Sequence, residues 1–87
     1  MRRYTVVVSD KAEKQLAAIR DRALLRALTE RILALGENPR PHKVKKLKGR
    51  HEQWRVREGD WRIVYRIEDD RLVVLVVAVA KRDEVYR

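Results

Sequence analysis

The sequence has 87 residues, of which 45% are hydrophobic and 40% are charged, and its formal net charge is +9. This length suits a single domain spanning residues 1–87, and the hydrophobic content is enough for a core, which excludes a disordered tail. There is no cysteine, no apolar signal segment at the start and no apolar run longer than nine residues, so we exclude a disulfide scaffold, a secreted precursor and a membrane span, and expect a cytoplasmic protein.

The first elements predicted are a strand and a helix. Residues 4–8 are rich in valine, which favours a strand. Ser9 or Asp10 can cap the helix that follows, and Asp10 with Glu13 has the spacing of a capping box. Apolar residues then recur at helical spacing up to Ile19.

A second helix is predicted to begin near Asp21. Its apolar stripe comprises Leu24, Leu25, Leu28, Ile32 and Leu35. Gly36 is a natural residue to follow the end of a helix, and Pro39 stops any continuation. We therefore expect a helical hairpin.

The C-terminal half changes to a period of two. After a basic loop over residues 40–50, residues 53–58 and 61–68 alternate between apolar and polar side chains around a two-residue Gly59-Asp60 turn. Residues 72–80 are continuously apolar, which suits a central strand. The predicted fold class is α+β, with β-α-α-β-β-β order and a helical hairpin packed on one face of a mostly antiparallel four-stranded sheet.

The turn fixes the register of the predicted hairpin. Trp54, Val56, Ile63 and Tyr65 then share the face beneath the helices. Arg55, Arg57 and Arg62 share the other face, where Val73, Leu75 and Val77 of the last strand supply an apolar floor. Arg57 and Arg62 stand directly opposite each other, which is destabilising unless an anion bridges them. The alternatives are that both side chains splay into solvent, or that a bulge at the turn separates them.

Basic residues are concentrated in one part of the chain. Residues 40–62 contain nine Lys or Arg against three Asp or Glu, a net charge of +6. Arginine binds phosphate through two parallel hydrogen bonds and can stack on bases. A charge run is often only a solvated surface, but this density on predicted strands favours nucleic acid as the target.

Five short motifs in the same order resemble the RelE/ParE toxin superfamily, most closely its RelE branch. They are Leu47-Lys48-Gly49, Trp54-Arg55-Val56-Arg57, Trp61-Arg62-Ile63-Val64-Tyr65, Val79-Ala80-Lys81-Arg82 and Glu84-Val85-Tyr86. The resemblance implies a toxin of a type II toxin–antitoxin system. It also implies an endoribonuclease that enters the A site of the 70S ribosome, contacts ribosomal RNA and cuts mRNA by 2′-OH attack, without metal or cofactor. The partner it implies is an antitoxin with an acidic, amphipathic segment.

The same resemblance implies roles for individual residues. Arg55 and Arg57 match two basic residues of the first hairpin strand, and Arg62 matches an arginine that stabilises phosphate charge. Arg82 matches a phosphate ligand and leaving-group acid, and Tyr86 a tyrosine that orients the target nucleotide. Five lysines are expected to bind RNA: Lys43, Lys45, Lys46, Lys48 and Lys81.

The general base stays open. The superfamily often has lysine where this sequence has Arg55 and Arg57, and arginine remains protonated at any working pH. Either a nearby side chain takes the proton, or preorganised charge stabilisation does most of the work. The candidate bases are Lys46, Lys48, His51 and Glu52.

Two other functions are compatible with the sequence. A ParE-like relative would bind and poison DNA gyrase, although such proteins generally lack the pairing of Arg82 with Tyr86. A non-catalytic RNA- or DNA-binding module would show steeply salt-dependent binding without cleavage. A zinc site is disfavoured, because the sequence has two histidines and no cysteine.

Overall fold

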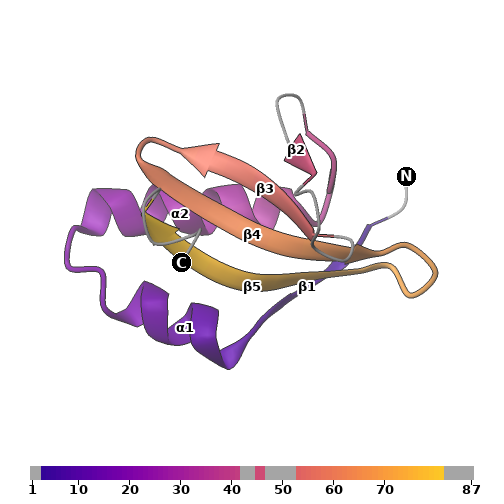
Figure 1. The fold of residues 1–87 in the computed structure, drawn as a ribbon, viewed down its shortest axis with the longest axis horizontal. Helices are drawn as coiled ribbons and strands as arrows, with labels where there is room; N and C mark the ends of the chain where they lie inside the picture. The colour runs from indigo at the N-terminus through magenta and orange to yellow at the C-terminus, as the bar shows by residue number, and fades with distance from the viewer. Residues whose placement is uncertain (1–2, 42–44, 47–52, 82–87) are drawn as a thin grey trace.

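The computed structural model describes residues 3–41, 45–46 and 53–81, with only the backbone of 45–46. Five strands and two helices follow one another along the chain (Figure 1). They are β1 (Thr5–Val8), α1 (Asp10–Ala17), α2 (Arg22–Ala34), β2 (Lys45–Lys46), β3 (Gln53–Glu58), β4 (Trp61–Glu68) and β5 (Val73–Lys81). None of the helices in these residues is long and apolar enough to cross a membrane.

The strands form one sheet in the order β1-β5-β4-β3-β2. Strand β1 runs parallel to β5, and the other neighbouring pairs are antiparallel. This confirms the predicted α+β class, the element order and the central place of the last strand. The short strand β2 was not predicted: it adds two residues of the basic segment to the outer edge of β3.

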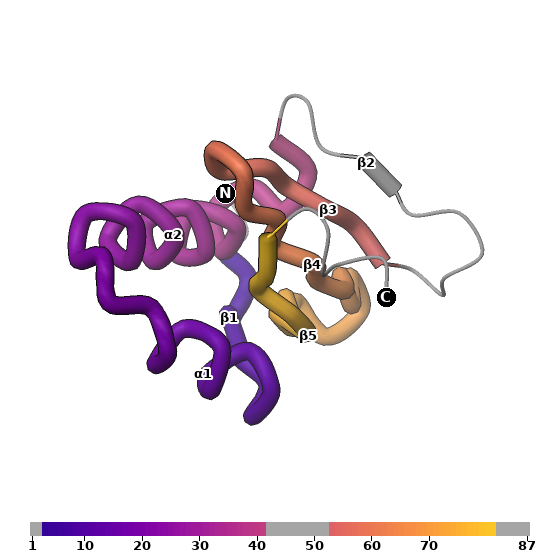
Figure 2. The backbone as a smooth tube through the Cα atoms, turned by 60° about the vertical axis from the view of Figure 1, so that its left-hand side comes forward, coloured from indigo at the N-terminus to yellow at the C-terminus, as the bar shows by residue number. Residues whose placement is uncertain are grey.

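Both helices lie on one side of the sheet, as predicted (Figure 2). Helix α1 packs against β5 and α2 against β3. The cap of α1 is Ser9, whose hydroxyl oxygen accepts from the Ala12 amide at 3.1 Å. The spacing of Asp10 and Glu13 therefore does not mark a capping box here, because Asp10 is already the first helical residue.

The second helix begins where the sequence predicts. The Asp21 carboxylate accepts hydrogen bonds from the amides of Ala23 and Leu24, which satisfies two of the amides that a helix start leaves unpaired. Gly36 follows the C-cap but does not adopt a positive φ. It is needed for space instead, since a Cβ there would lie 3.0 Å from the carbonyl oxygen of Tyr4 and 3.1 Å from Val6.

The β3–β4 hairpin has the predicted register. Glu58 pairs with Trp61 and Val56 with Ile63, and Gly59 has the positive φ (59°) of a tight turn. The alternation consequently places Val56, Ile63 and Tyr65 in the core, at 4% exposure or less.

Strand β5 contains a bulge that the sequence did not reveal. Val64 of β4 pairs with Ala78, but Tyr65 pairs with Val76, so Val77 has no partner in β4. Val74 and Val76 before the bulge, and Val79 after it, are all fully buried. The extra residue therefore shifts by one position which side chains of β5 face the helices. As a result, apolar side chains lie under the helices both before and after the bulge.

Candidate functional site

Four arginines share the sheet face that points away from the helices, which we call the arginine face. Arg55 and Arg57 come from β3, and Arg62 and Arg66 come from β4. Arg57 lies directly opposite Arg62, as predicted, and Arg55 lies opposite Val64, diagonal to both Arg62 and Arg66. Arg57 and Arg66 are exposed and Arg55 is half-buried, so the side chains form a basic stripe along the hairpin.

The Arg62 side chain does not splay into solvent, which was one of the alternatives that the sequence left open. It is only 4% exposed, and its Nη1 donates to the carbonyl oxygens of Gly59 at 3.3 Å and Trp61 at 3.1 Å. These bonds fix the guanidinium beside the turn. A guanidinium held in this way loses little conformational entropy when it binds an anion, which is the property that phosphate recognition requires.

The floor of the arginine face is apolar, but its composition differs from the prediction. Val73 and Leu75 pair with Glu68 and Arg66, and both are half-buried. Beyond the bulge, Ala78 and Ala80 take the place expected for Val77, because they pair with Val64 and Arg62. The floor beside Arg62 is thus made of small side chains, and both Ala80 and Arg62 are buried there.

The basic segment is described only in part. Strand β2 places Lys45 opposite Arg55 and Lys46 opposite Trp54, so its backbone joins the sheet next to the arginine-bearing strand β3. The remaining predicted site residues lie outside the described residues. They are Lys43, Lys48, His51, Glu52, Arg82 and Tyr86.

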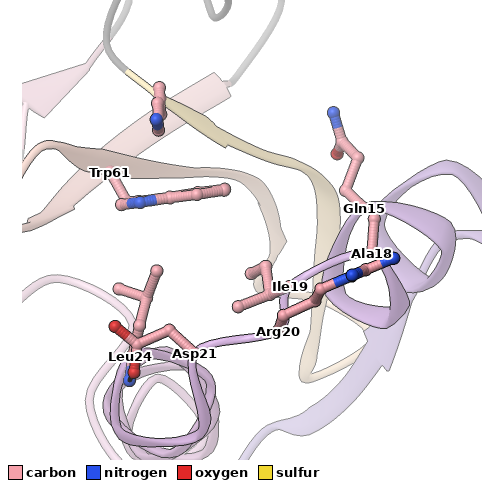
Figure 3. A pocket seen from close by; sticks show the side chains of 8 residues that line it. Gln15, Ala18, Ile19, Arg20, Asp21, Leu24 and Trp61 are labelled. Carbon is pink, nitrogen blue, oxygen red and sulfur yellow. Dashed lines mark hydrogen bonds between the residues drawn. The ribbon is translucent and has the colours of Figure 1, made fainter.

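Lys81 lies on the helix side of the sheet, away from the arginine face. It pairs with Trp61, and both line an open groove of about 450 Å³ between the helices and the start of β4. Figure 3 shows the Trp61 ring facing Leu24 and Ile19 across this groove. Lys81 is consequently not brought together with Arg55, Arg57 and Arg62.

A polar cluster at the far end of the hairpin holds the start of the basic segment. Asp69, in the β4–β5 turn, binds Arg40 through two hydrogen bonds of 2.9 and 3.2 Å and accepts a third from the Tyr4 hydroxyl at 2.5 Å. The Arg40 guanidinium also stacks over Trp54, 5.3 Å from the ring centroid. The neighbouring Tyr65 hydroxyl donates to the carbonyl oxygen of Pro39 at 2.7 Å. The chain is therefore anchored immediately before the lysine-rich residues.

This cluster shifts the pKa values of its members. Hydrogen bonds from Arg40, and then from Tyr4, lower the pKa of Asp69 to about 2. The hydrogen bond to Asp69 raises the pKa of Tyr4, and burial raises the pKa of Tyr65. The Asp69 carboxylate is therefore ionised throughout the physiological range.

Sequence reasoning overlooked two features of this surface. Arg66 continues the alternation of Arg62 along β4, so the period of two already places it on the same face. The Asp69 cluster was not predictable in the same way, because residues from four distant parts of the chain form it. Among the described residues, no group of three His, Asp or Glu side chains is arranged to hold a metal ion.

The family model for the ParE toxin of type II toxin–antitoxin systems, parDE, matches residues 6–86, nearly the whole chain. The chain belongs to the RelE/ParE toxin superfamily. No curated protein sequence matches this toxin significantly.

Solved structures of the superfamily share the fold of this toxin. The RelBE2 toxin–antitoxin complex from Mycobacterium tuberculosis has a chain with 29% identity and a TM-score of 0.77, covering 92% of this chain and 99% of that one. An archaeal RelE–RelB complex from Pyrococcus horikoshii has a chain with 26% identity and a TM-score of 0.79, covering 94% of this chain and 97% of that one. The isolated Escherichia coli RelE toxin has 26% identity and a TM-score of 0.76, covering 95% of this chain and 90% of that one. The resemblance to the superfamily is thus confirmed along nearly the full length of the toxin.

Proposed function

We propose that this toxin is a ribosome-dependent endoribonuclease that cuts mRNA in the A site. The observation that carries the proposal is the pairing of Arg57 with Arg62 across the hairpin, on a face with two further arginines. Two like charges in this position destabilise a sheet. A phosphate bound between the two guanidinium groups relieves that repulsion. The arginine pair is therefore more favourable with a phosphate bound than without one.

The proposed reaction needs charge stabilisation more than it needs a cofactor. The ribose 2′-OH loses its proton and attacks the adjacent phosphorus, and the 5′-oxygen of the next nucleotide leaves and gains a proton. The products are a 2′,3′-cyclic phosphate and a free 5′-OH. Extra negative charge develops on the phosphate oxygens at the pentavalent stage, where preorganised guanidinium groups supply several kcal/mol.

Residues outside the described part of the chain complete the proposal. Arg82 is proposed to hold the scissile phosphate and protonate the leaving oxygen, and Tyr86 to orient the target nucleotide. Because Arg55 and Arg57 cannot act as bases, the proton acceptor is sought among Lys46, Lys48, His51 and Glu52. Lysines of the basic segment, including Lys43 and Lys45, are proposed to contact ribosomal RNA.

An antitoxin is the proposed protein partner, and the cytoplasm, where ribosomes work, is the proposed location. Two of the similar solved structures are complexes of a RelE-type toxin with a RelB antitoxin. The net charge of +9 on this toxin favours a partner with an acidic segment. An amphipathic segment of that kind can neutralise the basic residues while it covers apolar surface.

The alternative is a ParE-like inhibitor of DNA gyrase, and the description of the matching family model favours it. The two functions predict different damage. A gyrase inhibitor leaves mRNA intact and traps DNA breaks with gyrase. A ribosome-dependent nuclease produces no such breaks.

Primer extension on ribosomes translating a defined mRNA tests the proposal. Wild-type toxin is expected to produce cuts within the A-site codon, and Arg82→Ala and Tyr86→Phe to reduce the cleavage rate at least tenfold. Arg26→Ala, which removes an exposed charge from α2 on the other side of the sheet, serves as a control and should cut normally. Absence of cleavage by the wild-type protein, together with gyrase-trapped DNA breaks, would replace the proposal by the alternative.

A further inference from the structure

Arg66 extends the arginine face beyond the residues that the proposed reaction uses. It lies four residues along β4 from Arg62, a distance of about 13 Å in a strand. It pairs with Gln53 on one side and Leu75 on the other. This backbone separation allows Arg66 to contact a different phosphate from the one proposed to lie between Arg57 and Arg62.

The exposed guanidinium of Arg66 is available to a ligand. Within the described ranges, the side chain of Arg66 takes part in no hydrogen bond or ion pair. Other arginines of the described surface are occupied by carboxylates: Arg31 by Glu58 and Arg40 by Asp69, at 3.0 and 2.9 Å. The acidic residue nearest to Arg66 on its own strand face is Glu68, which Arg71 binds at 3.0 Å.

The surroundings of Arg66 match the chemistry of a single-stranded nucleic acid. Arg55 lies diagonal to both Arg62 and Arg66, so positive charge continues from the paired arginines along the hairpin. Leu75, opposite Arg66, and Val73, opposite Glu68, are both half-buried and expose apolar surface on the same face. A positively charged track that follows the backbone is one of the means by which proteins bind single strands, and Leu75 adds apolar surface beside it.

We propose that Arg66 forms a second phosphate-binding subsite, which holds the RNA strand at a nucleotide beyond the one that is cut. The proposal rests on the proposed function for the identity of the strand as RNA. In this arrangement, Arg57 and Arg62 hold the scissile phosphate, and Arg66 binds a phosphate further along the RNA strand. Arg55 lies between these two positions. Arg66 is thus a binding residue that lengthens the footprint on RNA without taking part in the reaction.

Binding of short RNAs by the full-length toxin tests this subsite. Two fluorescent RNAs carry 2′-O-methyl groups, so that they cannot be cut, and differ in length: a dinucleotide and an octanucleotide. Arg66→Gln is expected to weaken octanucleotide binding by about threefold or more and to lower the salt slope by about 0.7, the value for one phosphate contact. Dinucleotide binding should stay unchanged, and Arg66→Lys should retain most of the octanucleotide affinity.

Arg26→Gln on α2 is the matched control, because it removes the same charge from the helix side and should change neither affinity. Three results overturn the subsite: wild-type binding by Arg66→Gln, an equal loss for both lengths, or the same loss in Arg26→Gln. The ribosome assay separates the two proposals. Toxin that fails to cut mRNA but shows the length-dependent loss retains the subsite and loses the proposed function. Toxin that cuts without that loss retains the proposed function only.

Discussion

Arg57 and Arg62 occupy directly opposite positions in an antiparallel pair, which is costly for two like charges. Replacing Arg57 by threonine removes the repulsion and adds a β-branched side chain. We predict that Arg57→Thr raises the free energy of unfolding by about 0.5 kcal/mol and the melting temperature by about 3 °C, while mRNA cleavage falls at least tenfold. Thermal melts followed by circular dichroism and ribosome assays measure the two effects.

Varying the salt concentration shows whether Arg57→Thr stabilises the fold by removing charge repulsion or by its higher β propensity. Screening weakens interactions between exposed charges, so the stabilisation in Arg57→Thr should shrink as salt is raised. Arg66→Thr is the matched control, since Arg66 lies opposite the neutral Gln53 and its substitution should give a smaller salt-dependent gain. A loss of stability in Arg57→Thr at low salt would contradict the repulsion.

The low pKa of Asp69 predicts that the stability of the fold depends on pH. Its folded pKa is about 2, below the unfolded value of about 3.9, so it stabilises the fold above pH 4 and this contribution disappears as the pH falls toward 2. Asp69→Asn should lower the melting temperature at pH 7, and the difference from wild type should shrink steadily as the pH falls from 4 to 2. Melts at low salt between pH 2 and pH 7 measure this, and a constant difference would contradict the cluster.

At the scale of single residues, the alternation of side chains and the turn residues predict much of the hairpin. The Gly59-Asp60 turn and the two alternating segments were enough to derive the register of the hairpin and the position of Arg57 opposite Arg62. Local pattern did not reveal that the Arg62 side chain folds back onto the turn. Burial and hydrogen bonding of a side chain depend on what packs around it, which a period of two does not encode.

Ser9 joins helix α1 to the bulge of β5. Its hydroxyl accepts from the Ala12 amide and donates to the Val77 carbonyl at 3.1 Å, so one side chain caps the helix and satisfies an oxygen of the bulged residue. We predict that Ser9→Ala lowers the free energy of unfolding by about 2 kcal/mol, near the upper end for loss of a cap.

The exposed cap Asp21 offers a comparison for Ser9, because its carboxylate bonds only to amides of its own helix among the described residues. Asp21→Ala should cost about 1 kcal/mol. Urea unfolding followed by circular dichroism gives both values. Equal costs would show that the bond from Ser9 to the bulge contributes nothing.

At the scale of elements, the sequence predicts all four long strands and both helices, but not the irregularities between them. Residues 72–80 are apolar at every position, so no period reveals that Val77 is an extra residue. Lys45 and Lys46 have low strand propensity, and they join the sheet by pairing with the edge of β3. Both features depend on neighbouring strands rather than on local sequence.

At the scale of the molecule, the sheet separates two surfaces. The helix side carries the core and the groove with Trp61 and Lys81, and the opposite side carries the arginine stripe. Charge composition alone predicted a basic nucleic-acid-binding surface, but it could not assign each cation to a side. The register of β5 after the bulge does this for Lys81, which pairs with Trp61 on the helix side of the sheet.

The central claim is that Arg57 and Arg62 act on one phosphate, and a double-mutant cycle tests it most directly. Single-turnover cleavage rates on programmed ribosomes are measured for wild type, Arg57→Ala, Arg62→Ala and the double variant, with circular dichroism to verify folding. Residues that act as a unit give strongly non-additive effects. We predict that each single variant loses at least tenfold in rate and that the double variant loses far less than the product of the two. Losses that multiply fully would contradict the claim.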